Sequence, residues 1–314
     1  MTGVRQIESG QPHQARVCAI VVTFFPDRDL GDRLRLAGDQ VEILIVVDNS
    51  ADRSTLLQLE QLRSDRVHLI FQERNVGLAC ALNAGLRWAR AAGFQWALLL
   101  DQDTTLLQNA AEELLSIVAD YPHPDSIAAV GSSYNQATSA QCQWTEETSV
   151  ITSGTLVSLT ALEKIGPFRE DFFVDCVDLE YCLRARARGF AILRSSKKLM
   201  EHQIGNVTVH KIFGFRAGTS NHTVVRRYYL ARNLTALIRE YRYREPAWAA
   251  RMILNQLKSM ILLGLFEENR WRKLKSYLLG VYDGINGWFG RDLAEWGMQA
   301  VNSRSIDCHT EAGR

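Results

Sequence analysis

The chain has 314 residues and a formal net charge of +1, and 46% of its residues are hydrophobic. The near-zero charge argues against a dedicated nucleic-acid binder, and the length suffices for one large domain or two unequal ones. The sequence has no uninterrupted run of 18 apolar residues and no secretory signal, so we expect no spanning helix and a cytoplasmic location. The six cysteines form no Cys-x-x-Cys pair, which favours free thiols in a reducing compartment.

The first half of the chain alternates between short apolar runs and segments with helical periodicity. Strands are expected at 17–22, 41–47, 67–71 and 97–100, and helices at 30–36, 56–62, 78–92 and 106–118. This alternation is typical of an α/β domain with a mostly parallel sheet and helices on both faces.

The pattern changes after about residue 150. A β-branched, glycine-containing run at 151–157 precedes an expected helix at 178–189 and a short strand at 191–193. From Thr223 the chain has the pattern of helices, with no strong break before Gly284. We therefore predict a flexible tail at 1–15, an α/β domain at 16–210 and a mainly helical region at 211–314.

Two aspartates, Asp101 and Asp103, follow the apolar strand expected at 97–100. In open α/β sheets, ligands bind at the carboxyl ends of the strands. Two nearby carboxylates repel each other, and a hard cation such as Mg²⁺ or Mn²⁺, which prefers carboxylate, water and phosphate oxygens, relieves that repulsion. The pattern favours a metal-bridged phosphate site, with a solvated turn as the alternative.

Asp48 ends another expected strand in the same way. A strand-end aspartate beside a phosphate site commonly accepts hydrogen bonds from a base or a ribose. The alternative is that Asp48 caps the helix that starts near Ser54.

The segment 74–79, which contains Asn75 and Gly77, opens a helix directly after a strand. Gly77 would allow close approach of a ligand to the backbone, and the N–H groups of the helix N-terminus favour an anion. The spacing is not Gly-x-Gly-x-x-Gly, which argues against a nicotinamide dehydrogenase. An asparagine cap on a helix packed tightly against the sheet is a compatible alternative.

Three acidic residues, Asp175, Asp178 and Glu180, lie at or near the start of the helix expected at 178–189. Aromatic and apolar neighbours indicate partial burial, which raises the pKa of a carboxylate and suits a general base. The alternative is a set of acids favoured by the helix dipole, one of them paired with Arg184. His202 is a candidate third metal ligand, although a lone histidine is more often a surface or core residue.

In this order, the segments resemble the inverting glycosyltransferases of family 2, which have the nucleotide-sugar-binding fold called GT-A. The resemblance covers about residues 17–210 and depends on 21–26, 47–50, 75–77, 83–85, 101–103, 153–154 and 177–184. The sequence motifs at 101–103, 173–180 and 227–233 are most similar to those of bacterial rhamnosyltransferases of polysaccharide or O-antigen assembly.

The resemblance implies a role for each matching residue. It implies donor binding by Thr23, Asp48, Asn75, Gly77, Asn83 and Asp101, and a Mg²⁺ or Mn²⁺ site made by Asp101, Asp103 and His202. It also implies that Asp178 is the catalytic base. Many family members have Glu-Asp where this chain has Val177-Asp178, which leaves Asp178 as the candidate within that pair, with Asp175 and Glu180 as competitors.

The implied reaction moves L-rhamnose from dTDP-L-rhamnose to a saccharide or lipid-linked saccharide acceptor with inversion. The alternatives are another donor such as a UDP-hexose, a non-catalytic nucleotide-sugar-binding protein of the same fold, and a nucleotidyltransferase. The presence of Asp101, Asp103 and Asp178 argues against a non-catalytic protein. A nucleotidyltransferase would require a basic glycine-rich loop near the N-terminus, and residues 23–26 do not form one.

The region 223–290 carries many apolar residues among basic ones. The apolar residues are Trp248, Met252, Ile253, Leu257, Met260, Ile261, Leu262, Leu263, Leu265 and Phe266, and the basic residues are Arg251, Lys258, Arg270, Arg272, Lys273 and Lys275. This mixture favours peripheral contact with the inner face of the cell membrane. The alternatives are burial in the core and a homodimer interface.

Overall fold

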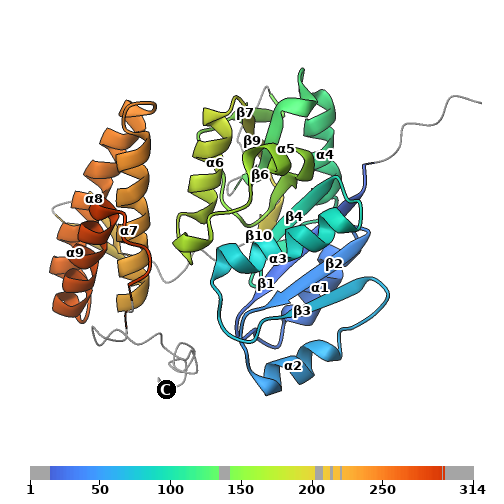
Figure 1. The fold of residues 1–314 in the computed structure, drawn as a ribbon, viewed down its shortest axis with the longest axis horizontal. Helices are drawn as coiled ribbons and strands as arrows, with labels where there is room; N and C mark the ends of the chain where they lie inside the picture. The colour runs from blue at the N-terminus through green and yellow to red at the C-terminus, as the bar shows by residue number, and fades with distance from the viewer. Residues whose placement is uncertain are drawn as a thin grey trace, which may run out of the picture.

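The computed structural model describes residues 15–133, 142–201, 208–212, 215–219, 221–291 and 293. An α/β part lies beside a group of three long helices (Figure 1). His202 and residues 1–14 of the expected tail lie outside the described residues, so the predictions made for them stay predictions.

Four parallel strands form one half of the main sheet. They are β1 (Val17–Thr23), β2 (Ile43–Asp48), β3 (Val67–Phe71) and β4 (Trp96–Asp101), in the order β3-β2-β1-β4. In the pairing register, Thr23 lies opposite Asp48, and Val22 lies opposite Asp101. The carboxyl ends of β1, β2 and β4 therefore meet at one edge, as the sequence predicts.

The other half of the sheet is mixed. β8 (Thr155–Ser158) runs antiparallel between β4 and β6 (Ile127–Ser133), β9 (Ala191–Lys198) is parallel to β6, and β7 (Trp144–Glu146) is antiparallel to β9. The strand order β3-β2-β1-β4-β8-β6-β9-β7 confirms a mostly parallel sheet. Sequence patterns alone did not predict β6, because small residues fill much of this strand and weaken its hydrophobic signal.

Helices cover both faces of this sheet, as expected. α1 (Leu30–Gly38) and α4 (Ala110–Asp120) pack against one face, and α3 (Leu78–Ala91), α5 (Leu159–Ile165) and α6 (Val177–Ala187) pack against the other. Along β4, Ala97 and Leu99 belong to one hydrophobic cluster, whereas Leu98 and Leu100 belong to the opposite one. This alternation follows from the two-residue period of a strand.

Short elements complete the α/β part. α2 (Arg53–Glu60) lies between β2 and β3, the 3-10 helix η1 (Pro124–Ser126) precedes β6, and the 3-10 helix η2 (Glu170–Phe172) precedes α6. Two small antiparallel pairs lie outside the main sheet. β5 (Thr105–Leu106) pairs with β10 (Met200–Glu201), and β11 (Thr208–Ile212) pairs with β12 (Phe215–Thr219). Leu106 lies in β5, so the helix expected from this residue begins later, at Ala110. The boundary expected between residues 210 and 211 falls inside β11.

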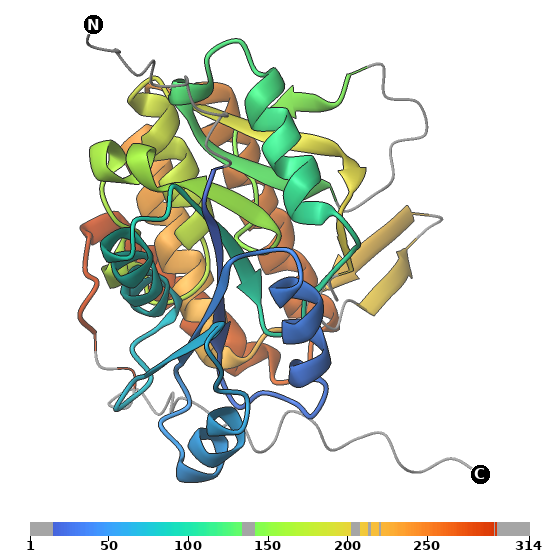
Figure 2. The same ribbon diagram turned by 90° about the vertical axis from the view of Figure 1, so that its right-hand side faces the viewer.

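The helical region consists of α7 (Val224–Tyr241), α8 (Pro246–Phe266) and α9 (Arg270–Asn286). Figure 2 shows these helices stacked behind the sheet, and side chains of α7 and α8 join the core cluster that contains α3 and α6. Gly284 does not break a helix. It lies within α9, where an added Cβ atom would approach the Thr235 Cβ atom of α7 to 2.8 Å, so its lack of a side chain allows the two helices to pack closely.

The apolar residues of α8 are divided between the interior and the surface. Trp248, Leu262 and Leu263 are buried, in agreement with the alternative of burial in the core, whereas Leu257 and Ile261 are exposed. By length and composition α8 is long and apolar enough to cross a membrane, whereas the sequence analysis expected no such helix. Of the most apolar 18-residue stretch of α8, 11% is buried. Core helices of water-soluble proteins pass the same test.

Candidate active site

Thr23 and Asp48 form the first part of the site, at the carboxyl ends of β1 and β2. The Thr23 hydroxyl donates a hydrogen bond of 2.9 Å to Asp48 Oδ1, and the Ser50 hydroxyl donates one of 2.7 Å to the same atom. Both side chains are buried at the strand ends. Asp48 does not cap α2, because Asp52 accepts the capping bond from the Thr55 backbone N–H. The helix-cap alternative for Asp48 is therefore wrong.

Two asparagines connect the loops that follow β2 and β3. Asn49 Nδ2 donates to Asn75 Oδ1 at 3.0 Å, and Asn49 Oδ1 accepts from the Val76 N–H at 2.9 Å. Asn75 Oδ1 also accepts from the Gly77 N–H at 3.0 Å. Asn75 is exposed, so it holds the loop while remaining accessible at the edge of the sheet.

Gly77 packs closely against another segment of the chain. Its φ of +84° favours glycine, and an added Cβ atom would lie 2.6 Å from the carbonyl oxygen of Phe173. That oxygen also accepts a 2.6 Å hydrogen bond from the Leu78 N–H at the start of α3. The segment around Phe173 thus lies against Gly77 and accepts the hydrogen bond from the Leu78 N–H, and the expected approach of a ligand to Gly77 stays a prediction.

Asn83 is likewise committed to the protein itself. It is 2% exposed, and its Nδ2 donates to the Phe168 carbonyl at 2.8 Å and to Glu170 Oε1 at 2.9 Å. Its Oδ1 accepts from the Phe168 N–H at 2.9 Å. Both polar atoms of the side chain hold the segment before α6, and the expected contact of Asn83 with the donor stays a prediction.

Asp101 and Asp103 lie at the end of β4, with Gln102 anchoring the turn between them. Gln102 Oε1 accepts from the Phe24 N–H at 2.7 Å, and Gln102 Nε2 donates to the Phe24 carbonyl at 3.2 Å. This two-way contact joins the ends of β1 and β4. Asp101 is half-buried and Asp103 is exposed. The sequence analysis assigned no role to Gln102 within the 101–103 motif, because nothing in the local pattern shows that its amide reaches a neighbouring strand.

The turn at 152–154 connects Asp101 with Asp178. The Asp101 N–H donates to the Ser153 hydroxyl at 3.1 Å, and the Thr152 N–H donates to Asp178 Oδ2 at 3.1 Å. Ser153 is fully buried. Because adjacent residues of one turn contact both aspartates, the end of β4 and the start of α6 belong to the same site.

The environment of Asp178 raises the pKa of its carboxyl group above the ordinary value. Burial is the largest cause, and the negative charge of Asp175 acts in the same direction. Hydrogen bonds from the backbone N–H groups of Leu179 and Thr152 oppose this rise. A carboxylate with a raised pKa is a stronger proton acceptor, as a general base requires.

The competing acids are engaged in ion pairs. Asp175 accepts hydrogen bonds from Nε and Nη2 of Arg226 in α7, and the shortest N–O distance is 2.9 Å. Glu180 is 2% exposed and accepts two 2.8 Å hydrogen bonds from Arg184. The expected Arg184 salt bridge is thus present, and its partner is Glu180.

Arg226 is a residue of the site that the sequence analysis did not identify. Burial opposes its charge, but the carboxylates of Asp175 and, more weakly, Asp101 raise the pKa of the guanidinium. The helical region therefore contributes a cation that pairs with Asp175 and whose pKa the charge of Asp101 also raises. No local sequence signal links α7 to β4, since the contact depends on tertiary packing.

The carboxylates of Asp101 and Asp103 have the oxygen-donor chemistry that Mg²⁺ and Mn²⁺ prefer. Among the residues that the structure describes, no three His, Cys, Asp or Glu side chains are grouped to hold a metal ion. The expected third ligand, His202, lies outside them. The donor set fits a cation whose coordination is completed by diphosphate oxygens and water.

These features define an α/β protein with acidic residues at the carboxyl edge of a mostly parallel sheet, which is where proteins of this class bind ligands. Residues 20–165 match the family model described as Glycosyl transferase family 2. The chain is 28% identical over 295 residues to the dTDP-rhamnosyl transferase RfbF of Shigella flexneri, across 88% of this chain and 97% of that protein.

A solved structure shows the same fold. The crystal structure of GalNAc-T7 with UDP, GalNAc and Mn²⁺ is 10% identical, with a TM-score of 0.52 over 79% of this chain and 58% of that one. Residues 1–349 of S. aureus TarS are 14% identical, with a TM-score of 0.48 over 88% and 93% of the two chains. The chain is therefore a glycosyltransferase whose residues 20–165 match family 2 and whose fold is of the GT-A type, which confirms the resemblance seen in the sequence.

Proposed function

We propose that the protein transfers L-rhamnose from dTDP-L-rhamnose to a saccharide or lipid-linked saccharide with inversion of the anomeric configuration. The observation that carries the chemistry is the turn at 152–154, which contacts both Asp101 and Asp178. The donor assignment is supported by the similarity to the Shigella flexneri dTDP-rhamnosyl transferase along most of both chains.

In the proposed reaction, Thr23, Asp48 and the accessible Asn75 lie on the side of the nucleoside, and Asp101 and Asp103 lie on the side of the diphosphate. When bound, Mg²⁺ or Mn²⁺ would neutralise the leaving diphosphate as a Lewis acid. Asp178 accepts the proton of the acceptor hydroxyl, whose oxygen forms the new bond to the anomeric carbon as the bond to the diphosphate breaks. One such displacement inverts the configuration without a covalent intermediate.

A donor panel tests this function. Purified protein is incubated with Mn²⁺ or Mg²⁺ and each of dTDP-rhamnose, a UDP-hexose and a GDP-sugar, and release of the nucleoside diphosphate is measured. We expect dTDP-rhamnose to be turned over fastest. Preference for a UDP-hexose would replace the donor assignment, and binding of a donor without turnover by any acceptor preparation would favour the non-catalytic alternative.

We also propose that the exposed face of α8 and α9 lies on the anionic inner surface of the cell membrane. Its large exposed side chains are Ile253, Leu254, Leu257, Ile261, Leu265, Phe266, Leu278, Tyr282 and Ile285. Exposed Arg251, Lys258, Arg270, Arg272 and Lys275 lie on the same two helices. Apolar side chains interspersed with cationic ones suit the boundary between headgroups and acyl chains, and a lipid-linked acceptor would be presented there.

Co-sedimentation with vesicles tests this placement. We expect binding to vesicles that contain phosphatidylglycerol, weaker binding to neutral vesicles, and reduced binding of Ile261→Gln. Leu57→Gln is a matched control, because Leu57 lies on α2 and both side chains are 57% exposed. No binding to either vesicle, together with a soluble dimer at low concentration, would assign the face to a homodimer interface instead.

A further inference from the structure

The segment that leads into α6 has an unusual backbone. Phe173, Asp175 and Cys176 have φ values of +62°, +61° and +60°. Residues with a Cβ atom rarely adopt this left-handed conformation, and several within four positions require support from the surrounding structure. Asp178 follows two residues later, so the conformation of this segment sets where the proposed base lies.

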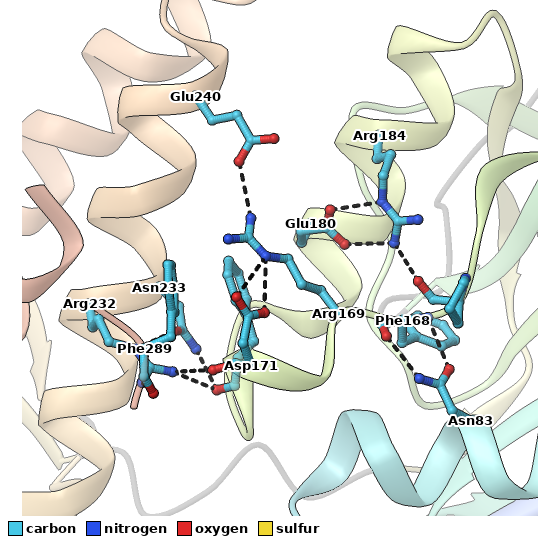
Figure 3. Close-up of polar contacts among 12 residues, drawn as sticks. Asn83, Phe168, Arg169, Asp171, Glu180, Arg184, Arg232, Asn233, Glu240 and Phe289 are labelled. Atoms are coloured by element: carbon cyan, nitrogen blue, oxygen red, sulfur yellow. Dashed lines mark hydrogen bonds and ion pairs between the residues drawn. The ribbon is translucent and has the colours of Figure 1, made fainter. Parts of the chain in front are cut away.

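Asn233 of α7 gathers the carbonyl groups of this segment. It is fully buried, and its Nδ2 donates to the carbonyls of Phe172, Val174 and Asp175 at 2.9, 2.8 and 2.9 Å. These carbonyls flank the positive-φ residues, so one amide group fixes the course of the backbone there. Figure 3 shows Asn233 pointing from α7 toward the segment.

Arg232 reinforces this contact. Its Nε donates to Asn233 Oδ1 at 2.9 Å, and its Nη2 donates to the carbonyls of Asp171 and Phe172 at 2.7 and 3.2 Å (Figure 3). Its guanidinium also lies 4.9 Å from the centroid of the Tyr229 ring. The Nε bond orients the Asn233 amide with its N–H groups toward the segment.

The charge of Arg232 is held in an apolar setting. The side chain is 1% exposed, and burial lowers the pKa of its guanidinium below the ordinary value. Its hydrogen bonds to Asn233, Phe289, Asp171 and Phe172 go to carbonyl or amide oxygens, and Tyr228 and the charge of Asp171 raise the pKa against the effect of burial. A buried charge whose hydrogen bonds go to neutral groups is unfavourable for stability, which is consistent with a role in conformational specificity.

The segment is fixed from its other sides as well. Asn83 of α3 holds Phe168, and Arg184 of α6 donates to the carbonyls of Ile165 and Pro167, each at 2.7 Å. Arg169 bridges to Glu240 of α7 at 3.0 Å. The stretch from Ile165 to Asp175 is therefore held at both ends, and the α7 contacts lie nearest to Asp178.

We propose that Asn233, oriented by Arg232, is a positioning residue that holds the Asp178 segment in its catalytic conformation. The helical region thus completes the active site. This inference rests on the proposed function because it takes Asp178 as the base. That Asn233 and Arg232 hold the backbone at 171–178 does not depend on this assignment.

The test compares Asn233→Asp with Ser276→Ala. The first variant is nearly isosteric and still accepts from Arg232, but it loses the N–H groups that reach the three carbonyls. The second removes another hydrogen bond of the helical region, from the buried Ser276 of α9 to the Val224 carbonyl at the start of α7, and this bond involves no residue of the segment. Hydrogen exchange of peptides covering 171–183 and steady-state kinetics are measured on both, with whichever donor the wild type turns over.

We expect faster exchange at 171–183 and a kcat lowered about 10- to 100-fold in Asn233→Asp, with the donor KM little changed. Ser276→Ala should match the wild type in both measurements. In an Asp178→Asn background, Asn233→Asp should lower kcat no further, because the residues act as one unit.

The proposal would be overturned by unchanged hydrogen exchange at 171–183 in Asn233→Asp, or by equal losses of kcat in Asn233→Asp and Ser276→Ala. A further, additive loss of kcat in the double variant with Asp178→Asn would also overturn it. If the wild type turns over no donor, the proposed function fails, and the exchange comparison by itself decides whether Asn233 holds the segment.

Discussion

Replacing Asp178 with asparagine is expected to lower kcat at least about 10²-fold while nucleotide binding is kept. The amide is nearly isosteric with the carboxylate, so the hydrogen bond from the Leu179 N–H at 2.8 Å can persist. It cannot accept the proton of the acceptor hydroxyl, which removes general-base assistance from the displacement. Donor KM and kcat, measured separately, show whether the loss lies in the chemical step.

The controls for this variant are the two competing acids. Asp175→Asn and Glu180→Gln break the ion pairs with Arg226 and Arg184, so thermal unfolding is followed alongside kinetics. We expect losses smaller than that of Asp178→Asn in variants that remain folded. A larger loss in either variant, with Asp178→Asn near wild type, would move the base to that residue.

The pH profile gives a second check on Asp178. Because the pKa of this carboxyl group is raised, its basic form is lost as the pH falls through that raised value. The acidic limb of kcat should therefore lie at a higher pH than the ordinary aspartate value of 3.8. Residual activity of Asp178→Asn should lack this limb, and a limb retained unchanged would assign it to another group.

Replacing Asp103 with alanine is expected to abolish the contribution of Mn²⁺ to the binding of a nucleoside diphosphate. Asp103 is exposed at the carboxyl end of β4, and its carboxylate is one of two that face the proposed diphosphate site. Calorimetric titration of dTDP with and without Mn²⁺ measures the effect. The wild type should bind more tightly with the metal, and the variant should bind equally in both conditions.

Asp125→Ala is the matched control for Asp103→Ala. Asp125 is an exposed acid in η1, directly before β6. The direction of β6 places its amino end at the edge of the sheet opposite to the carboxyl end of β4. This variant should keep the full effect of Mn²⁺. Full activity of Asp103→Ala, or equal dTDP affinity of the wild type with and without metal, would contradict the proposed metal site.

The sequence by itself determined the parallel half of the sheet and the carboxylates at its edge. β-branched apolar runs of strand length alternate with amphipathic helices, and this local pattern specifies parallel strands whose ends meet. Thr23, Asp48 and Asp101 could be placed together because each directly follows or ends such a run. The order of motifs carried the family resemblance for the same reason, since it is a property of the chain itself.

Tertiary structure alone decided which distant segments the residues of the predicted binding loops contact. Asn83 and Gly77 have the residue types of a binding loop, yet they contact Phe168 and Phe173, some 85 to 96 positions further along the chain. Asn233 likewise acts on carbonyls about 60 positions earlier. Hydrogen-bond partners of buried polar groups are fixed by packing between distant segments, and no local periodicity encodes them.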